Sequence, residues 1–355
     1  MILPISEMLA SKRKWYSTEG QLADTVLSTR VRLARNIKGL RFPGRMMPEE
    51  ASSVVHRVES AALGLDCLDG CKFTPMESLS VLERQFLLER HLISFDLASG
   101  GSNCGLIFDN SEGVSAMINE EDHVRIQAFK PGFQLDSCLQ AANILDDHFE
   151  SSFEWAFSDE FGYLTACPTN VGTGLRASVL IHLPALVLTR KVKKVLSGVT
   201  QVGLAVRGFY GEGTDVFGNF FQISNQITLG EKETQALLNL ERVVRQLIDY
   251  EEKARDVLMR DASEQIKDKV RRAHGVFTNA YLLSSEETIG LASAIRLGIT
   301  LGIPDLPKIQ TINDILLYTQ PAHLQLMAGK EMGSEERNLF RAKYITEKMQ
   351  ADSAA

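Results

Sequence analysis

The sequence predicts an α+β fold, in which an antiparallel sheet is flanked by helices and followed by a smaller all-α region. Up to about residue 230, segments that alternate apolar and polar residues lie between segments of helical character. Hairpins beside helices favour an antiparallel sheet with helices packed on it. After Gly230 nearly every segment is helix-like, and glycine-rich loops almost vanish. We therefore expect two domains, residues 1–255 and an all-helical domain of residues 256–355.

The individual elements follow from local patterns. TVLSTRVRLARN and NEEDHVRIQAF alternate as half-buried strands do, and GLIFDNSEGVSAMIN is typical of a hairpin. VGLAV and YLTAC are expected to be short strands. GLRASVLIHL is expected to be a helix that begins at the turn PTNVGTG. Further helices are expected over residues 48–63, 79–92 and 135–149.

Composition and charge argue against several classes of protein. The 355 residues are 44% apolar and 23% charged, as in ordinary soluble globular proteins. A net charge of −7 gives a surface that as a whole does not attract nucleic acid or an anionic membrane. The longest apolar run, residues 177–188, is interrupted by His182 and Pro184 and is too short to span a bilayer.

The five cysteines are scattered and odd in number, so no disulfide framework is expected. The natural compartment is then a reducing cytoplasm. Cys67 and Cys71 stand four apart in CLDGC, with no histidine or second cysteine pair nearby. Two ordinary thiols are expected there, and no metal site.

The segment STRVRLAR concentrates arginine on one face of an expected strand. Alternation places Ser28, Arg30 and Arg32 on one face of the strand. The opposite face then carries Leu27, Thr29, Val31 and Leu33. Two guanidinium groups on neighbouring same-face positions repel each other unless an anion lies between them. The face is therefore either solvated or a phosphate site.

The segment NEEDHVR allows the same reasoning. On a strand, Glu121 shares a face with Arg125, whereas Glu120 and Asp122 lie on the other face. Three acids in a row are also typical of a solvated edge. If the face with Arg125 looks into a site, Glu121 is the carboxylate that works there.

Two further segments have both a structural and a functional interpretation. In RGFYGEGTDVFGN, Arg207 ends an apolar strand, and the glycines that follow surround Glu212. This is either a plain surface loop or a lid that carries a carboxylate. Cys167 precedes a turn whose backbone amides, with Arg176, could hold an anion. It is either a buried structural cysteine or a thiolate held by Thr169 and backbone donors.

Together these segments resemble one family, the phosphagen (guanidino) kinases, and in particular its bacterial protein-arginine kinase branch. The resemblance spans about residues 20–230, and the helical tail is also similar to this branch. The motifs that carry it are STRVRLARN, ERHLIS, NEEDHVRIQ, CPTNVGTGLRAS and RGFYGEGTDVFGNFFQISNQIT. The fold implied is the phosphagen-kinase catalytic domain followed by a helical domain for dimerisation and phosphoarginine binding.

The resemblance also implies roles for single residues. ATP and Mg²⁺ are expected, with the nucleotide held by Ser28, Arg30, Arg32, His91, Arg125, Arg176 and Arg207. Glu121 and Glu212 would grip the substrate guanidinium, with Glu121 as general base and Cys167 beside it. These residue types suit the chemistry, because phosphoryl transfer needs positioning and charge stabilisation. A cationic guanidinium must also lose a proton as the N–P bond forms.

Two departures from the family pattern bear on substrate and regulation. In small-molecule guanidino kinases a sizeable helical domain precedes the STRVR segment, which here starts at Ser28; a more open site is expected. The protein-arginine branch has an Arg-Asp-x-x-Arg-Ala motif associated with phosphoarginine. This chain has Arg337, Asn338, Arg341 and Ala342 there. The two arginines can still take a phosphate, or the segment is an ordinary amphipathic helix.

The leading hypothesis is an ATP-dependent protein-arginine kinase that marks proteins for Clp-type proteolysis or regulation. The resemblance implies as partners proteins with exposed arginine, the activator McsA, the protease ClpC and the repressor CtsR. A homodimer is expected, and no membrane. The alternatives are a kinase of free arginine or another small guanidino compound, and a catalytically inactive adaptor.

Overall fold

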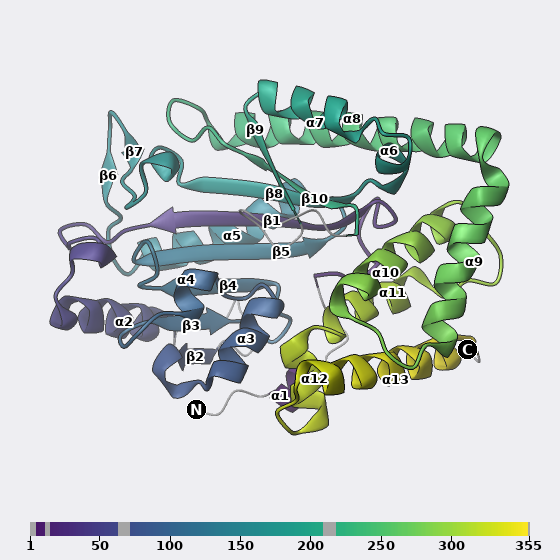
Figure 1. The fold of residues 1–355 in the computed structure, drawn as a ribbon. Helices are drawn as coiled ribbons and strands as arrows, with labels where there is room; N and C mark the ends of the chain where they lie inside the picture. The colour runs from purple at the N-terminus through teal and green to yellow at the C-terminus, as the bar shows by residue number, and fades with distance from the viewer. Residues whose placement is uncertain (1–4, 11–14, 63–71, 209–217, 354–355) are drawn as a thin grey trace.

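The computed structural model of the chain describes residues 5–10, 15–62, 72–208 and 218–353. An eight-stranded sheet lies at the centre of the molecule, in the order β2-β3-β4-β5-β1-β8-β10-β9 (Figure 1). Every strand pair in it is antiparallel, which confirms the predicted sheet. The strands are β1 (Val26–Arg35), β2 (Lys72–Pro75), β3 (Gly105–Phe108), β4 (Val114–Ile118), β5 (Val124–Pro131), β8 (Leu175–His182), β9 (Leu204–Gly208) and β10 (Phe220–Asn225). A separate hairpin consists of β6 (Phe157–Ser158) and β7 (Gly162–Tyr163).

Helices cover one face of this sheet. Their apolar residues form one core with the residues of the central strands that point to that face. The helices are α2 (Pro48–Ala62), α5 (Leu135–Glu150), α6 (Pro184–Leu188), α7 (Val192–Gln201) and α8 (Glu233–Asp261). α1 (Ile5–Ala10), α3 (Val81–Glu89) and α4 (Phe95–Ala98) form a separate apolar cluster with residues of β3 and β4 that point to the opposite face of the sheet. α3 begins at Val81 because Ser80 and Glu83 form a capping box. The three predicted helices are confirmed.

The expected helix over GLRASVLIHL is wrong, because this segment forms the strand β8. Leu175, Ala177, Val179 and Ile181 enter the core, while Arg176 and Ser178 point to the opposite face. The period is therefore two. The run of apolar residues after Ser178 hid this alternation, since Leu180 is also covered, by a second apolar cluster on the other face.

An irregularity in β1 changes which residues share a face. The register with β8 shifts between Val26 and Ser28, so that Leu27 is bulged. Leu27 was predicted to lie on the face of Val31, but it belongs to the second cluster, with Leu180 and the C-terminal helices. The bulge thus lets one end of β1 contact the helical part.

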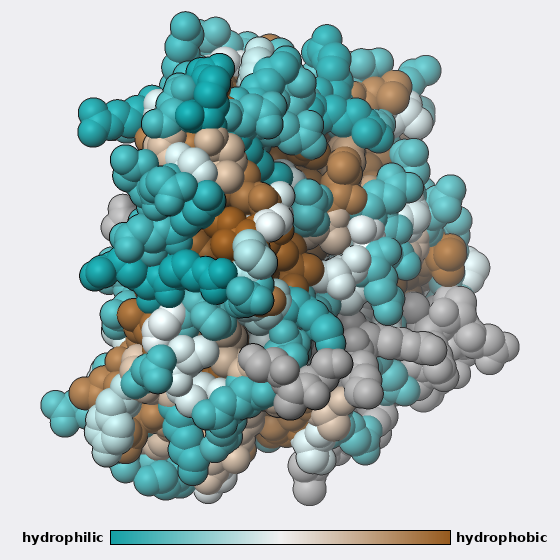
Figure 2. All heavy atoms as spheres, turned by 90° about the vertical axis from the view of Figure 1, so that its right-hand side faces the viewer, coloured by the Kyte–Doolittle hydropathy of each residue, from teal (hydrophilic) through white to brown (hydrophobic). Residues whose placement is uncertain are grey.

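The remaining helices form a compact C-terminal part. They are α9 (Ser263–Asn279), α10 (Ser285–Thr300), α11 (Ile309–Tyr318), α12 (Pro321–Ala328) and α13 (Ser334–Ser353). α8 runs unbroken through residue 255, so the expected domain boundary falls inside a helix. In the view that faces α9, apolar residues gather in a hollow bordered by hydrophilic ones (Figure 2). In the part of the chain that the structure describes, no helix has the length and apolar character needed to cross a membrane.

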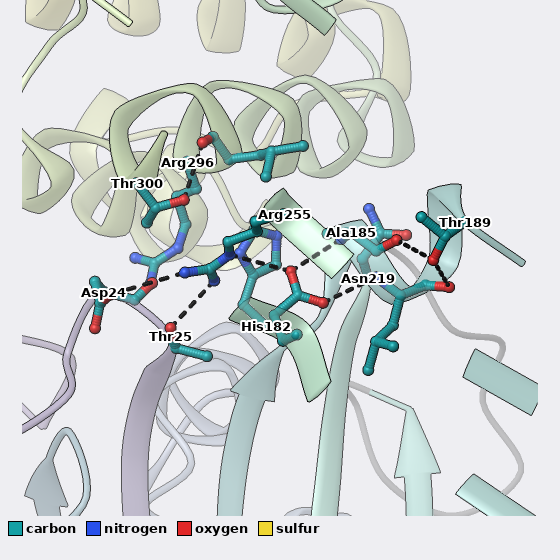
Figure 3. A network of polar contacts seen from close by, with 12 residues as sticks. Asp24, Thr25, His182, Ala185, Thr189, Asn219, Arg255, Arg296 and Thr300 are labelled. Atoms are coloured by element: carbon teal, nitrogen blue, oxygen red, sulfur yellow. Dashed lines mark hydrogen bonds and ion pairs between the residues drawn. The ribbon is translucent and has the colours of Figure 1, made fainter. Parts of the chain in front are cut away.

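Buried polar contacts fasten the C-terminal part to the ends of the strands (Figure 3). Arg296 of α10 donates to the carbonyls of Ala23 (3.1 Å) and Asp24 (2.9 Å), just ahead of β1. Arg255 of α8 donates to Thr25 Oγ1 at 3.1 Å and to Glu251 at 3.3 Å. These guanidinium groups are buried but have partners supplied by the protein itself.

Candidate active site

The face of the sheet opposite the helices of the main core carries the predicted arginines. The strand register places Arg32 directly across from Arg176, and Arg30 across from Ser178. On the other side of β1, Arg32 lies across from Gln127, one same-face position from Arg125. Arg207 of β9 pairs with Gln222 of β10, which in turn pairs with Leu180. The sheet therefore gathers five guanidinium groups that are up to 177 positions apart in sequence (30 to 207).

Burial and neighbouring arginines lower the pKa of two members of this cluster, Arg30 and Arg32. Burial, followed by the charges of Arg176, Arg125 and Arg207, lowers the pKa of Arg30 to about 10. Burial and the charges of Arg30 and Arg125 hold the pKa of Arg32 well below its ordinary value. Among the described residues, the buried Nε of Arg32 has no hydrogen-bond partner. A cluster of desolvated cations with an unmet donor is a site prepared for an anion.

Two carboxylates border the cluster through Arg125. Its Nη1 donates to Glu120 at 2.8 Å and its Nη2 to Glu121 at 2.5 Å. The prediction that only Glu121 faces Arg125 is therefore wrong. β5 begins at Val124, and residues 119–123 form a turn in which strand alternation does not apply.

The two glutamates nevertheless differ in access. The side chain of Glu120 is fully buried and also accepts a hydrogen bond from the Ser94 hydroxyl at 2.5 Å. The side chain of Glu121 is 40% exposed. Glu121 is thus the carboxylate that an incoming group can reach, as predicted, although for a different reason.

Cys167 lies at the start of a one-turn 3₁₀ helix, Pro168–Asn170. It is partly exposed rather than buried, and its Sγ lies 3.0 Å from Thr169 Oγ1. The partner residue is the one that the sequence suggested. The expected strand YLTAC is shorter than predicted, since β7 ends at Tyr163.

Two residues that sequence reasoning missed tie the Glu121 turn to the Cys167 segment. Asp122 Oδ1 accepts hydrogen bonds from Asn36 Nδ2 (2.6 Å) and from the backbone N–H of Ala166 (2.7 Å). Asn36 also donates to the carbonyl of Leu164 (3.0 Å) and accepts from the backbone N–H of His123 (2.9 Å). Both loops are thereby fixed to the end of β1. Asp122 could not be distinguished from its acidic neighbours in the sequence.

Ser28 and His91 lie at the other end of the arginine face. With Arg30, Phe129, Ser178 and Gln222 they line a small cavity of about 30 Å³. His91 has a positive φ of 60° and packs edge-on against Trp15 at 5.1 Å. Burial and the charge of Arg30 lower its pKa to about 3, so this imidazole is neutral. An apolar cavity of about 450 Å³ shares Trp15 and His91 with the small one and extends to the C-terminal helices.

Some predicted residues lie elsewhere. Glu212, Cys67 and Cys71 fall outside the described residues. Arg341 is 2% exposed and donates to the carbonyls of Thr319 (3.0 Å) and Leu283 (2.8 Å) and to Asn338 Oδ1 (2.7 Å). Arg337 donates to the carbonyl of Met332 at 2.6 Å. Phosphoarginine binding by these two arginines stays a prediction, and for Arg341 it would require a change of partners.

Comparison with known families and proteins agrees with this geometry. Residues 53–254 match the family described as ATP:guanido phosphotransferase, C-terminal catalytic domain. Residues 263–355 match the protein-arginine kinase McsB C-terminal domain. The fold is also similar to the crystal structure of lombricine kinase, with a TM-score of 0.58 at 27% identity, over 64% of this chain and 66% of that one.

The sequence relatives are more specific. The chain is 47% identical over 342 residues to a protein-arginine kinase of Moorella thermoacetica, which covers 96% of this chain and 98% of the relative. It is 44% identical over 337 residues to that of Bacillus subtilis, covering 94% and 93%. The chain therefore belongs to the ATP:guanido phosphotransferases and, among them, to the protein-arginine kinases. It is a phosphotransferase that acts on arginine side chains of proteins.

Proposed function

We propose that the arginine face binds the phosphates of ATP. Arg30, Arg32, Arg125, Arg176 and Arg207 would surround them, while Ser28 and His91 contact the rest of the nucleotide. The observation that carries this proposal is the electrostatic state of Arg30 and Arg32. Neither forms an ion pair within the described residues, although both are largely removed from water. An anion of several charges would relieve their mutual repulsion.

Magnesium fits this site as a companion of the phosphates. Within the described residues, no cluster of three or more metal-ligating side chains is present. Mg²⁺ does not require one, because it is usually bound through one or two carboxylates together with substrate phosphates and water. Among the described residues, Glu120 and Glu121 are carboxylates that contact this cluster, through Arg125. The ion would offset part of the charge on the transferring group.

Glu121 is the proposed general base. A guanidinium nitrogen becomes nucleophilic only as it loses a proton, and a carboxylate in contact with it can accept that proton. Arg125 holds Glu121 at the edge of the arginine face, and Asp122 fixes the Cys167 segment to the same turn. Glu121, Cys167 and Glu212 would therefore orient the planar guanidinium toward the γ-phosphate.

The biological setting is proposed from the family resemblance. Phosphorylated arginine would mark proteins for a Clp-type protease, ClpC, or regulate them, as for the repressor CtsR, with McsA as activator and the cytoplasm as compartment. A homodimer is proposed as well. The two arginines of the last helix, Arg337 and Arg341, are the proposed phosphoarginine site. We place the border between the catalytic and helical domains near residue 255.

A competition assay tests the proposed substrate preference. A folded protein with exposed arginines and free arginine are supplied together with MgATP, and acid-labile phosphoarginine is measured in both pools. Protein arginine gains contacts from its surrounding surface that free arginine lacks. We expect kcat/KM for protein arginine to be at least about a hundredfold higher, roughly 2.7 kcal/mol of transition-state discrimination. Equal or preferred labelling of free arginine would contradict it.

A further inference from the structure

A groove on the catalytic part, far along the sheet from the Glu121 turn, has no role in the reaction above. It lies between α7 and α8 and has a volume of about 770 Å³. Its floor is apolar and is lined by Leu186, Val195, Val199, Val202, Val243 and Leu247. Val202 is 45% exposed, Tyr250 of the same lining is 39% exposed, and Val195 is half-buried, whereas the other four floor residues are at most 7% exposed. Val195, Val202 and Tyr250 therefore supply the apolar surface that water covers in the free chain.

The rim of the groove is basic. The charged residues that line it are Lys191, Lys194, Arg242 and Lys253, and none is acidic. Lys253 is paired with Asp249 at 2.6 Å, but neither Lys191 nor Lys194 forms an ion pair within the described part of the chain. This single-sign rim stands on a chain whose net charge is −7. Its local charge is therefore opposite to that of the molecule.

The position of the lysines in α7 adds an independent argument. Lys191 is the N-cap of this helix, and Lys193 and Lys194 lie in its first turn, which contains no acid. The N-terminus of a helix carries partial positive charge, so basic residues there are unfavourable. Helix stability alone does not explain them. An acidic occupant of the groove would offset both the lysines and the helix dipole.

We propose that the α7–α8 groove docks an acidic amphipathic helix of a partner protein. Apolar side chains spaced i, i+3, i+4 and i+7 on one face of such a helix would cover the floor. Acidic residues along its flanks would meet Lys191, Lys194 and Arg242. α7 has ten residues, about 15 Å of helix, which suits an occupant of two to four turns. A concave apolar floor favours protein side chains over a nucleic acid or a flat lipid surface.

The docking site also has a direct structural route to the arginine face. Val199 of α7 and Leu204 of β9 are both buried in the main core, and β9 carries Arg207. An occupant of the groove therefore contacts α7, which packs against β9, the strand that carries the proposed phosphate ligand Arg207. The proposal concerns binding and does not depend on the proposed nucleotide or base residues.

The test uses a synthetic 15-residue peptide, labelled with fluorescein, that has leucine at i, i+3, i+4 and i+7 spacing and glutamate elsewhere. Binding to the full chain is followed by fluorescence anisotropy. We expect saturable binding below about 100 μM that weakens as salt is raised. Lys194→Glu should weaken it at least about tenfold. Lys193→Glu, the same charge change in the same turn but outside the groove lining, should weaken it by no more than about threefold, the effect of the nearby charge alone.

A difference in binding between the Lys193→Glu and Lys194→Glu variants should not arise from unfolding of α7. An acid in the first turn of α7 favours the helix, so neither variant should unfold it, and thermal melts of both verify this. Val202→Glu should also weaken binding, because it places a negative charge in the groove that repels the acidic peptide. No binding, equal effects of Lys193→Glu and Lys194→Glu, or equal binding of a lysine-for-glutamate peptide would overturn the proposal. So would tighter binding to phosphatidylserine–phosphatidylcholine vesicles or to RNA than to the acidic peptide.

Discussion

Arg35 and Arg90 of the core are fully buried and Arg30 and Arg32 of the sheet face are partly buried, but the two pairs differ in their ionic partners. In the core, Arg35 binds Asp146 through Nε (2.9 Å) and Nη2 (2.6 Å), and Arg90 binds Glu112 through Nε (2.7 Å) and Nη2 (2.5 Å). On the sheet face, Arg30 and Arg32 have other arginines as neighbours.

The difference separates structure from function. A buried charge is tolerated when it is paired and hydrogen-bonded, so the core arginines come with the anion that they need. Burial and the charges of neighbouring arginines lower the pKa of Arg30 and of Arg32, and neither forms an ion pair within the described residues. These two cations therefore need an anion that comes from outside. We take this contrast as the physical basis of the phosphate site.

The largest effect is expected on stability, when a core arginine loses its ion-pair partner. Among the described residues, Asp146→Ala leaves the buried Arg35 guanidinium with only the more distant carboxylate of Glu233, at 4.0 Å, and should lower the free energy of unfolding by about 3–5 kcal/mol. Arg32→Ala removes a desolvated cation from a repulsive cluster and should leave the free energy of unfolding unchanged or raise it. Urea unfolding of both variants measures this. A large loss for Arg32→Ala would place it among the structural arginines.

The next effect concerns the carboxylates that border the cluster. Glu121→Gln keeps the shape of the side chain and removes the proton acceptor, so kcat should fall by about 10²-fold or more with ATP affinity little changed. Glu120→Gln removes a buried partner of Arg125 and should mainly lower stability. The roles are assigned the wrong way round if Glu120→Gln abolishes turnover while Glu121→Gln is mild.

Cys167 gives a smaller, chemical test of the same face. Burial raises the pKa of Cys138 to about 12, and burial also raises the pKa of Cys104. Cys167 is partly exposed beside Thr169, and it should react with iodoacetamide at least about tenfold faster than these two cysteines. ATP with a guanidino substrate should protect it. Peptide mapping by mass spectrometry gives the rates, and equal modification of the three would leave Cys167 with only a structural role.

The smallest effect is a pH dependence of the junction. Burial, with the charges of Arg296 and Arg255, holds the pKa of His182 well below its ordinary value. The folded chain keeps this imidazole neutral, whereas the unfolded chain takes up a proton near pH 6.5. Stability should therefore be lost as pH falls below about 6.5, by about 1 kcal/mol per pH unit for this group.

His182→Gln isolates that contribution. Glutamine keeps a polar group near Ser293 Oγ, to which the Nε2 of His182 is hydrogen-bonded at 2.8 Å, and it does not titrate. The slope of unfolding free energy against pH between 5 and 6.5 should be shallower in this variant. An unchanged slope would show that other groups, such as the buried His91, carry the dependence.

Strand alternation predicted that Arg30 and Arg32 share one face of β1, whereas the family resemblance supplied the other arginines of the candidate site. The register of the sheet brings Arg125, Arg176 and Arg207 to the same face, and their role stays a prediction. Alternation gave the wrong face where the chain is not a regular strand. Residues 119–123 are a turn, so Glu120 also contacts Arg125, and the bulge at Leu27 reverses its face.

Other features had no local signal. β8 was predicted as a helix because its last residues are apolar on both faces, with Leu180 packed against the C-terminal helices rather than exposed. The positioning role of Asp122 depends on Ala166, 44 positions away, and on Asn36, 86 positions away. Such contacts depend on the packing of the whole chain, so local patterns in a single sequence do not predict them.

The most direct test of the central claim is ATP binding to Arg32→Ala by isothermal titration calorimetry, with Arg245→Ala as a control. Arg245 is an exposed arginine of α8 that pairs with Glu241 at 2.8 Å, away from the sheet face. If Arg30 and Arg32 belong to the phosphate site, Arg32→Ala should weaken ATP binding by at least about 10²-fold, roughly 2.7 kcal/mol, while melting at the wild-type temperature or above. Arg245→Ala should bind ATP as the wild type does. Unchanged ATP affinity in a folded Arg32→Ala chain would contradict the account.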